Sequence, residues 1–135
     1  YFFIFFMVVN TTRSLIHFLA EDAGLNSIGN IIVFEGDPDP NRVIYLFGSL
    51  WGMMQLLCCL ISWIVIFKYR SLISFMYFIW LMEWILRETI IKYQHGLDFF
   101  YKTGPTPGSD YALLVIGLLF IFFIMSLRER AKLKL

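Results

Sequence analysis

The segment "CCLISWIVIFKYRSLISFMYFIWLMEWIL" (residues 58–86) contains two strongly apolar runs separated by the basic turn "KYRS" (68–71). The hydrocarbon core of a bilayer is about 30 Å thick, and a helix of about 20 residues is needed to cross it. Extended along the chain, the two runs reach about that length, over residues 43–67 and 71–93. They predict two transmembrane helices joined by a short turn.

Two further apolar runs cover residues 1–20 and 111–127. The 135-residue chain is 59% hydrophobic and only 16% charged, a composition that excludes an ordinary soluble domain. The first run lacks the basic start and the small-residue cleavage site of a signal peptide, so we expect a retained helix. The sequence therefore predicts an all-α fold, with residues 1–135 forming one integral membrane bundle of four transmembrane helices.

The charged residues outside the four runs predict an orientation. The turn at 68–71 and the tail "RERAKLKL" (128–135) are basic, whereas the connections at 21–42 and 95–110 are acidic and contain Pro and Gly. Because basic segments stay on the cytoplasmic side of a membrane, both termini are predicted to be cytoplasmic. This charge bias fits a bacterial inner membrane.

The first acidic connection is too long to be a simple turn. Its centre, residues 25–34, is apolar, and Asp22 or Asn26 is suited to cap a short helix there. Irregular backbone at membrane depth must be covered by protein or water, so this segment is expected to lie across the outer ends of the bundle. It is interpreted as a short interfacial helix, or alternatively as a lid.

The third predicted helix carries charges at regular spacing. Glu83 and Arg87 are four residues apart with the acid first, which favours an ion pair, and Glu88 and Lys92 repeat that spacing. At about 1.5 Å of rise per residue, Arg13 on the first helix lies at the depth of Glu83. We predict that these two helices face each other through an intramembrane polar cluster of Arg13, His17, Glu83, Arg87 and Glu88.

Two interpretations of this cluster stay open. Polar side chains within a bilayer often join helices and specify which helices pair. They also mark ligand pockets and proton pathways, because charges in hydrocarbon are otherwise rare. The cluster is therefore either structural or ligand-binding.

The second predicted helix contains the G-x-x-x-G motif formed by Gly48 and Gly52. Small residues at this spacing let two helix backbones approach closely, so the motif serves internal packing or a partner protein's helix, or it has no role. Gln55, one turn further, indicates that this face is buried.

Catalytic and metal-binding patterns are missing from the sequence. Its histidines, His17 and His95, are too few for a membrane di-iron site; either one is a conceivable ligand of a haem or pigment. A single histidine on a polar helix face is usually a hydrogen-bonding group, so no cofactor is predicted. The acidic stretch "EGDPDPN" (35–41) lacks the glycine spacing and bidentate Glu of a calcium loop. No metal site and no catalytic residues are predicted.

Several features resemble a family of small bacterial four-helix membrane proteins known only as a domain of unknown function. The matching residues are Arg42, Tyr45 and Gly48 at the start of the second helix, the "KYR" turn, and Arg87 late in the third helix. The resemblance implies the four-helix topology and carries no activity.

The sequence predicts a non-enzymatic accessory or structural subunit of a larger membrane complex, in contact with membrane lipids and other transmembrane subunits. The alternative is a protein that binds or transports a small ligand or lipid with the Arg13, His17, Glu83, Arg87 and Glu88 cluster. The basic tail is too short to indicate binding of nucleic acid.

Overall fold

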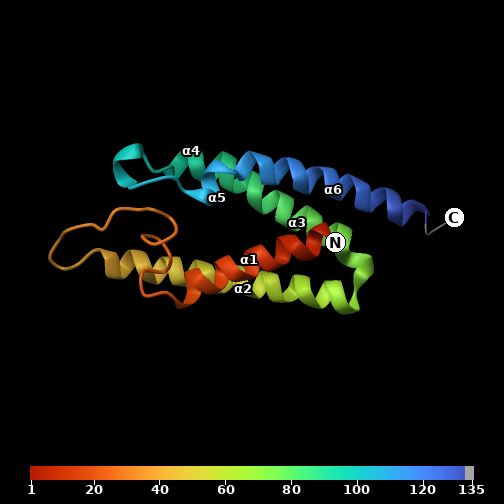
Figure 1. Cartoon of the computed structure of the whole chain (residues 1–135), viewed down its shortest axis with the longest axis horizontal. Helices are drawn as coiled ribbons and strands as arrows, with labels where there is room; N and C mark the ends of the chain where they lie inside the picture. Colours follow the sequence, from red (N-terminus) through yellow and green to blue (C-terminus); the bar gives the residue numbers. More distant parts are fainter. Residues whose placement is uncertain (133–135) are drawn as a thin grey trace.

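The computed structural model describes residues 1–132, and this part of the chain is all-helical, without a strand (Figure 1). Four helices are long: α1 (Phe2–Leu19), α2 (Asn41–Lys68), α3 (Ile73–Leu86) and α6 (Ala112–Lys132). Shorter elements connect them: η1 (Arg70–Leu72), η2 (Arg87–Ile91), α4 (Lys92–His95), η3 (Phe99–Tyr101) and α5 (Pro107–Asp110). Each of the four apolar runs in the sequence has therefore become helix.

The third apolar run forms one rod from three elements. The junction residues Leu86, Arg87, Ile91 and Lys92 all have right-handed helical backbone angles, so α3, η2 and α4 follow one another without a break. The middle element, η2, is a π-helical turn, a wide turn that often occurs at functional sites. This wide turn contains Glu88.

Two helices of the described part, α1 and α2, are long and apolar enough to cross a bilayer. The apolar part of α6, Ala112–Arg128, is shorter. The length and composition of these helices agree with a membrane protein.

The long helices form two pairs, α1 with α2 and α3 with α6 (Figure 1). The N-terminus, the end of α6 and residues 68–72 lie at one end of the molecule, which we call the terminal end. The connections 20–40 and 96–111 lie at the opposite end, which we call the loop end. All the connections that the sequence predicts to be acidic are therefore at the loop end.

Aromatic side chains join the two helix pairs. The ring centroids of Phe3 and Tyr77 are 4.7 Å apart, and Phe6 meets Trp80 edge-on at 5.5 Å. The indole Nε1 of Trp80 also donates a hydrogen bond of 3.0 Å to the hydroxyl of Ser62 on α2. Aromatic pairs of this kind contribute about 0.5–1.5 kcal/mol each beyond the area that they bury. The crossing of α1 and α3 is thus fixed by rings on both helices.

The prediction of an interfacial helix within residues 25–34 is wrong. Residues 21–29 form successive turns, and Ala23, Gly24 and Asn30 have φ values of 51°, 67° and 53°. These left-handed conformations, just before the apolar centre and within it, interrupt a right-handed helix. The carboxylate of Asp22 instead accepts hydrogen bonds of 2.7–3.1 Å from the backbone N–H groups of Gly24, Asn26 and Ser27.

The two connections at the loop end are hydrogen-bonded to each other. The backbone N–H of Thr103 donates to the carbonyl of Asn30 at 2.7 Å, and the Asn30 side-chain amide donates to the carbonyl of Pro105 at 2.5 Å. The hydroxyl of Thr106 donates to the carbonyl of Gly29 at 2.9 Å. Together the connections form a cover over one end of the helices.

Candidate functional site

The glycine motif of α2 lets α1 and the loop that follows it pack closely against α2. A Cβ atom on Gly52 would lie 2.7 Å from the backbone carbonyl carbon of His17, and one on Gly48 would lie 2.9 Å from the Cβ of Ala23. Both distances are too short for a side chain. The motif thus serves internal packing, and it places His17 at the start of the cover.

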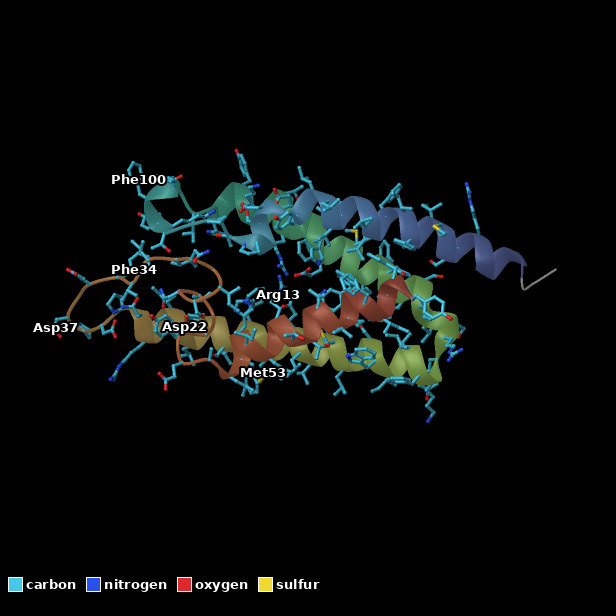
Figure 2. All side chains as sticks on the ribbon, in the orientation of Figure 1. Arg13, Asp22, Phe34, Asp37, Met53 and Phe100 are labelled. Atoms are coloured by element: carbon cyan, nitrogen blue, oxygen red, sulfur yellow. The ribbon has the colours of Figure 1, made fainter. Side chains whose placement is uncertain are left out.

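Arg13 lies on α1 and extends toward the α3–α6 pair (Figure 2). Its Nη2 donates a hydrogen bond of 2.7 Å to the Oε1 of Gln55 on α2, which also accepts one of 3.2 Å from Ser14. The predicted link between Arg13 and Glu83 is not formed. Gln55 takes its place because α1 packs directly along α2, whereas α1 and α3 have far less contact with each other.

The acids of the third rod pair within the rod. Glu83 forms an ion pair with Arg87, and Glu88 forms one with Lys92, each at the four-residue spacing seen in the sequence. The second carboxylate oxygen of Glu83 is buried and has no hydrogen-bond partner within the described residues. The rod therefore neutralises its own charges and supplies no carboxylate to Arg13.

Two tryptophans hold the two arginines in one place. The guanidinium carbon of Arg13 lies 5.4 Å from the ring centroid of Trp51 and 5.7 Å from that of Trp84. The guanidinium carbon of Arg87 lies 5.3 Å and 4.9 Å from the same two rings. Each contact is within the range in which a ring face attracts a cation. Neither ring was among the predicted site residues.

His17 is buried beside the same tryptophan. Its ring centroid is 4.7 Å from that of Trp51, and its Nδ1 lies 2.7 Å from the carbonyl oxygen of Ala23. A carbonyl can only accept, so Nδ1 carries the proton in this hydrogen bond. The other ring nitrogen, Nε2, is left available to a ligand.

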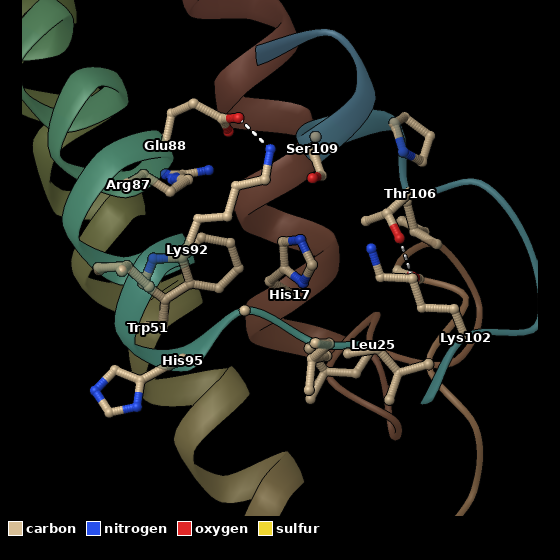
Figure 3. A pocket seen from close by; sticks show the side chains of 18 of the residues that line it. His17, Leu25, Trp51, Arg87, Glu88, Lys92, His95, Lys102, Thr106 and Ser109 are labelled. Atoms are coloured by element: carbon tan, nitrogen blue, oxygen red, sulfur yellow. Dashed lines mark hydrogen bonds and ion pairs between the residues drawn. The ribbon is translucent and has the colours of Figure 1, made fainter. Parts of the chain in front are cut away.

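A cavity of about 350 Å³ lies under the cover at the loop end (Figure 3). Arg13, His17, Arg87 and Glu88 of the predicted cluster line it, whereas Glu83 does not. His95, Lys92 and Lys102 also line it, and Figure 3 shows Ser109 opposite Lys92. Much of the remaining wall is apolar and consists of Leu25, Ile28, Ile31, Ile91 and Leu97.

The cavity contains more positive than negative charge. Four cations line it: Arg13, Arg87, Lys92 and Lys102. Arg87 and Lys92 are paired with the acids of their own rod, but Arg13 and Lys102 have no ion pair within residues 1–132. The Nε of Arg13 is moreover buried without a hydrogen-bond partner in this part of the chain.

The described residues contain no group of three His, Cys, Asp or Glu side chains that could hold a metal ion. Cys58 and Cys59 are free thiols outside the cavity. Comparison of the chain with protein-family models, curated proteins and solved structures finds no match. The resemblance to a family of unknown function stays a prediction.

Proposed function

We propose that this protein is an integral membrane protein of four spans that binds a small molecule or lipid in the cavity at its loop end. The lengths of α1 and α2, and the apolar character of α3 and of the Ala112–Arg128 part of α6, support four crossings. The basic turn and the basic residues at the end of α6 lie at the terminal end, so the positive-inside rule predicts that this end is cytoplasmic. The loop end would then face the outside of a bacterial inner membrane.

The observation that carries the binding function is the place of the polar cluster. Four of its five members border a cavity of about 350 Å³. Ligand pockets occupy about 300–1,000 Å³ and combine apolar walls with a few placed polar groups. A cluster that served only to join helices would have its polar groups paired with one another, whereas Arg13 has only a neutral partner, Gln55.

The function as an accessory subunit of a larger membrane complex stays the second candidate. Helix α6 turns large apolar side chains outward, with Leu113 and Leu114 73% and 60% exposed. Such a surface suits acyl chains and the helix of a partner subunit equally well. A test of the binding function must therefore separate a bound small molecule from a bound protein.

Filling the cavity provides that test. Ser109 lines the cavity, and the hydroxyl that it would lose makes no hydrogen bond within the described residues, so Ser109→Trp fills the space at little other cost. The matched control is Ser71→Trp, at an exposed position at the terminal end. All three proteins are extracted from membranes with mild detergent, sized, and analysed by mass spectrometry for polypeptides and small molecules.

A small molecule or lipid should be retained by the wild-type protein and by Ser71→Trp, and lost from Ser109→Trp. The binding function is wrong if the three preparations hold the same small molecules. Comigration of the same polypeptides with all three would then support the subunit function.

A further inference from the structure

We infer that the ligand of this cavity is an anionic amphiphile, a carboxylate or phosphate group joined to an apolar chain. The inference rests on the proposed binding function and adds the chemical class of the ligand. It is carried by two cations without a carboxylate partner, one on α1 and one on the cover, that line one cavity whose remaining lining is largely apolar.

The first of these cations, Arg13, is held in place but not neutralised. Gln55 accepts one hydrogen bond from its guanidinium group, and the rings of Trp51 and Trp84 attract its charge. Arg87 lies against the same two rings. Its ion pair is with Glu83 of its own rod, so that carboxylate is not paired with Arg13. Charged residues within a bilayer face the bundle interior or a water-filled cavity, and such residues usually mark a substrate or ion pathway.

The second cation, Lys102, approaches from the cover. Its backbone is fixed because residue 102 pairs with Ile31 of the other connection. Figure 3 shows Lys102 on the side of the cavity opposite to Arg87. An anion in the cavity would therefore meet positive charge from both the helices and the cover. Hydrogen bonds from charged donors to an anion are about twice as strong as bonds between neutral groups.

A hydroxyl and an imidazole complete the polar side of the cavity. The hydroxyl of Ser109 lines the cavity and has no hydrogen-bond partner among the described residues. The Nε2 of His17 accepts a hydrogen bond when the ring is neutral and donates one when the ring is protonated.

The apolar walls indicate that the ligand is more than a free anion. Leu25, Ile28 and Ile31 of the cover face the cavity, as do Ile91 and Leu97 beyond the wide turn. A small hydrophilic anion would leave these side chains against water, whereas an attached hydrocarbon chain would bury them. The cavity is at the lower end of the range for ligand pockets, so it holds the anionic head and the start of the chain.

The test measures binding of palmitate and of its neutral methyl ester to the full-length protein in nanodiscs of zwitterionic lipid. Variants are Arg13→Gln, Arg13→Lys and Lys102→Gln. Lys68→Gln is the matched control, since Lys68 is an exposed lysine at the terminal end and does not line the cavity. Lys102→Gln lies in a connection outside the helices, so it keeps the test valid if Arg13→Gln does not fold. Circular dichroism and sizing check each variant.

Palmitate should bind about tenfold or more tightly than its ester, because the ester lacks the charge that Arg13 and Lys102 meet. Lys102→Gln should weaken palmitate binding about tenfold. Arg13→Lys keeps the positive charge, so it should weaken binding less than Arg13→Gln does. Lys68→Gln should leave the affinity for palmitate unchanged. Equal binding of acid and ester, no binding of either, or equal affinities of Lys102→Gln and Lys68→Gln would overturn the inference.

Two competitors then identify the natural source of the anion. Displacement of palmitate by inorganic phosphate indicates a soluble phosphate compound, and displacement by phosphatidylglycerol vesicles indicates a lipid headgroup. Failure of the inference is distinguishable from failure of the proposed function. A neutral molecule that is retained by the wild type and lost from Ser109→Trp leaves the binding function standing and removes only the anionic class.

Discussion

Arg13 illustrates how far residue spacing determines contacts in a helical bundle. Helix rise places it at the depth of Glu83, yet its guanidinium group bonds to Gln55 and lies against Trp51 and Trp84. Depth along a helix does not specify which neighbour at that depth is nearest. The nearest polar group is on α2 because α1 and α2 pack directly together.

Pairs within one helix, by contrast, were predictable. The four-residue spacing of Glu83 with Arg87, and of Glu88 with Lys92, requires only helical geometry, and both ion pairs are present. The two tryptophans were not predictable from composition, because Trp in a membrane protein usually lies at the headgroup level. The signal that could have identified Trp84 is its position three residues before Arg87, on the same helix face.

Gly52 permits a residue-scale prediction. Gly52→Ala should lower the free energy of unfolding by about 1–3 kcal/mol, because the new Cβ would overlap the backbone of His17. The measurement is reversible unfolding in detergent. The control is Gly117→Ala on α6, where nothing lies within 4 Å of the added atom. That control should be neutral or stabilising by up to about 1 kcal/mol. Equal destabilisation by both changes would contradict the close packing of α1 against α2 at Gly52.

At the scale of elements, the four long apolar runs were sufficient to predict four long helices, because each run is continuous and strongly apolar. The first connection was not predicted correctly. Its apolar residues suggested a helix, but the left-handed backbone at Ala23, Gly24 and Asn30 breaks it into turns. The hydrogen bonds between the two connections also join residues more than 70 positions apart, and no local pattern indicates them.

Asp22 makes the first connection sensitive to acid. Burial acts to raise the pKa of Asp22, but hydrogen bonds from Ser27, Gly24 and Asn26 outweigh burial and hold the pKa below its ordinary value of 3.8. A lowered pKa stabilises the folded connection above pH 3.8, and this stabilisation is lost as the pH falls through the folded-state pKa. Hydrogen-exchange protection of residues 24–27 should therefore decrease in acid.

The matched variants separate the charge of Asp22 from its role as an acceptor. Asp22→Asn keeps an acceptor oxygen but has no carboxyl group to titrate. Hydrogen-exchange protection of residues 24–27 in this variant should therefore show no loss that follows protonation of residue 22 below pH 4. Asp22→Ala should lose protection at every pH, at a cost of about 1 kcal/mol. Unchanged protection in Asp22→Ala would show that the turns do not depend on this carboxylate.

Asn30 links the two connections of the cover. Asn30→Gly removes the side-chain hydrogen bond to Pro105 but keeps a residue that tolerates the left-handed conformation at this position. The backbone amides of Thr103 and Ile32, which bridge the connections, should exchange faster with solvent, while those of α2 should not change. Exchange rates equal to wild type at Thr103 would contradict this role.

At the scale of the molecule, the sequence indicated which segments share an end but not which helices pair. The charge distribution grouped both termini with the 68–71 turn, and in the structure the N-terminus, the end of α6 and this turn lie at one end. The pairing of α1 with α2 depends on close packing at Gly48 and Gly52. The pairing of α3 with α6 depends on ring contacts. Side-chain packing of this kind is set in three dimensions and is not visible as a period along the chain.

The proposed topology predicts where an impermeant thiol reagent reacts. Single cysteines at Asp37 in the first connection and at Ser71 in the turn are introduced after Cys58 and Cys59 are replaced by Ala. In intact cells Asp37→Cys should be labelled and Ser71→Cys should be labelled only after lysis, because the basic turn is predicted to be cytoplasmic. The opposite pattern would reverse the orientation, and labelling of both in intact cells would contradict the four-span topology.

The central claim is that the cavity at the loop end binds an anionic amphiphile through Arg13 and Lys102. Native mass spectrometry of the protein ejected from its own membrane tests this most directly, because it weighs the molecule that the cavity retains. The wild type and Lys68→Gln should retain the same acidic, chain-bearing molecule, and Lys102→Gln should lose most of it. Equal retention by Lys102→Gln, or a retained molecule without an acidic group, would contradict the claim.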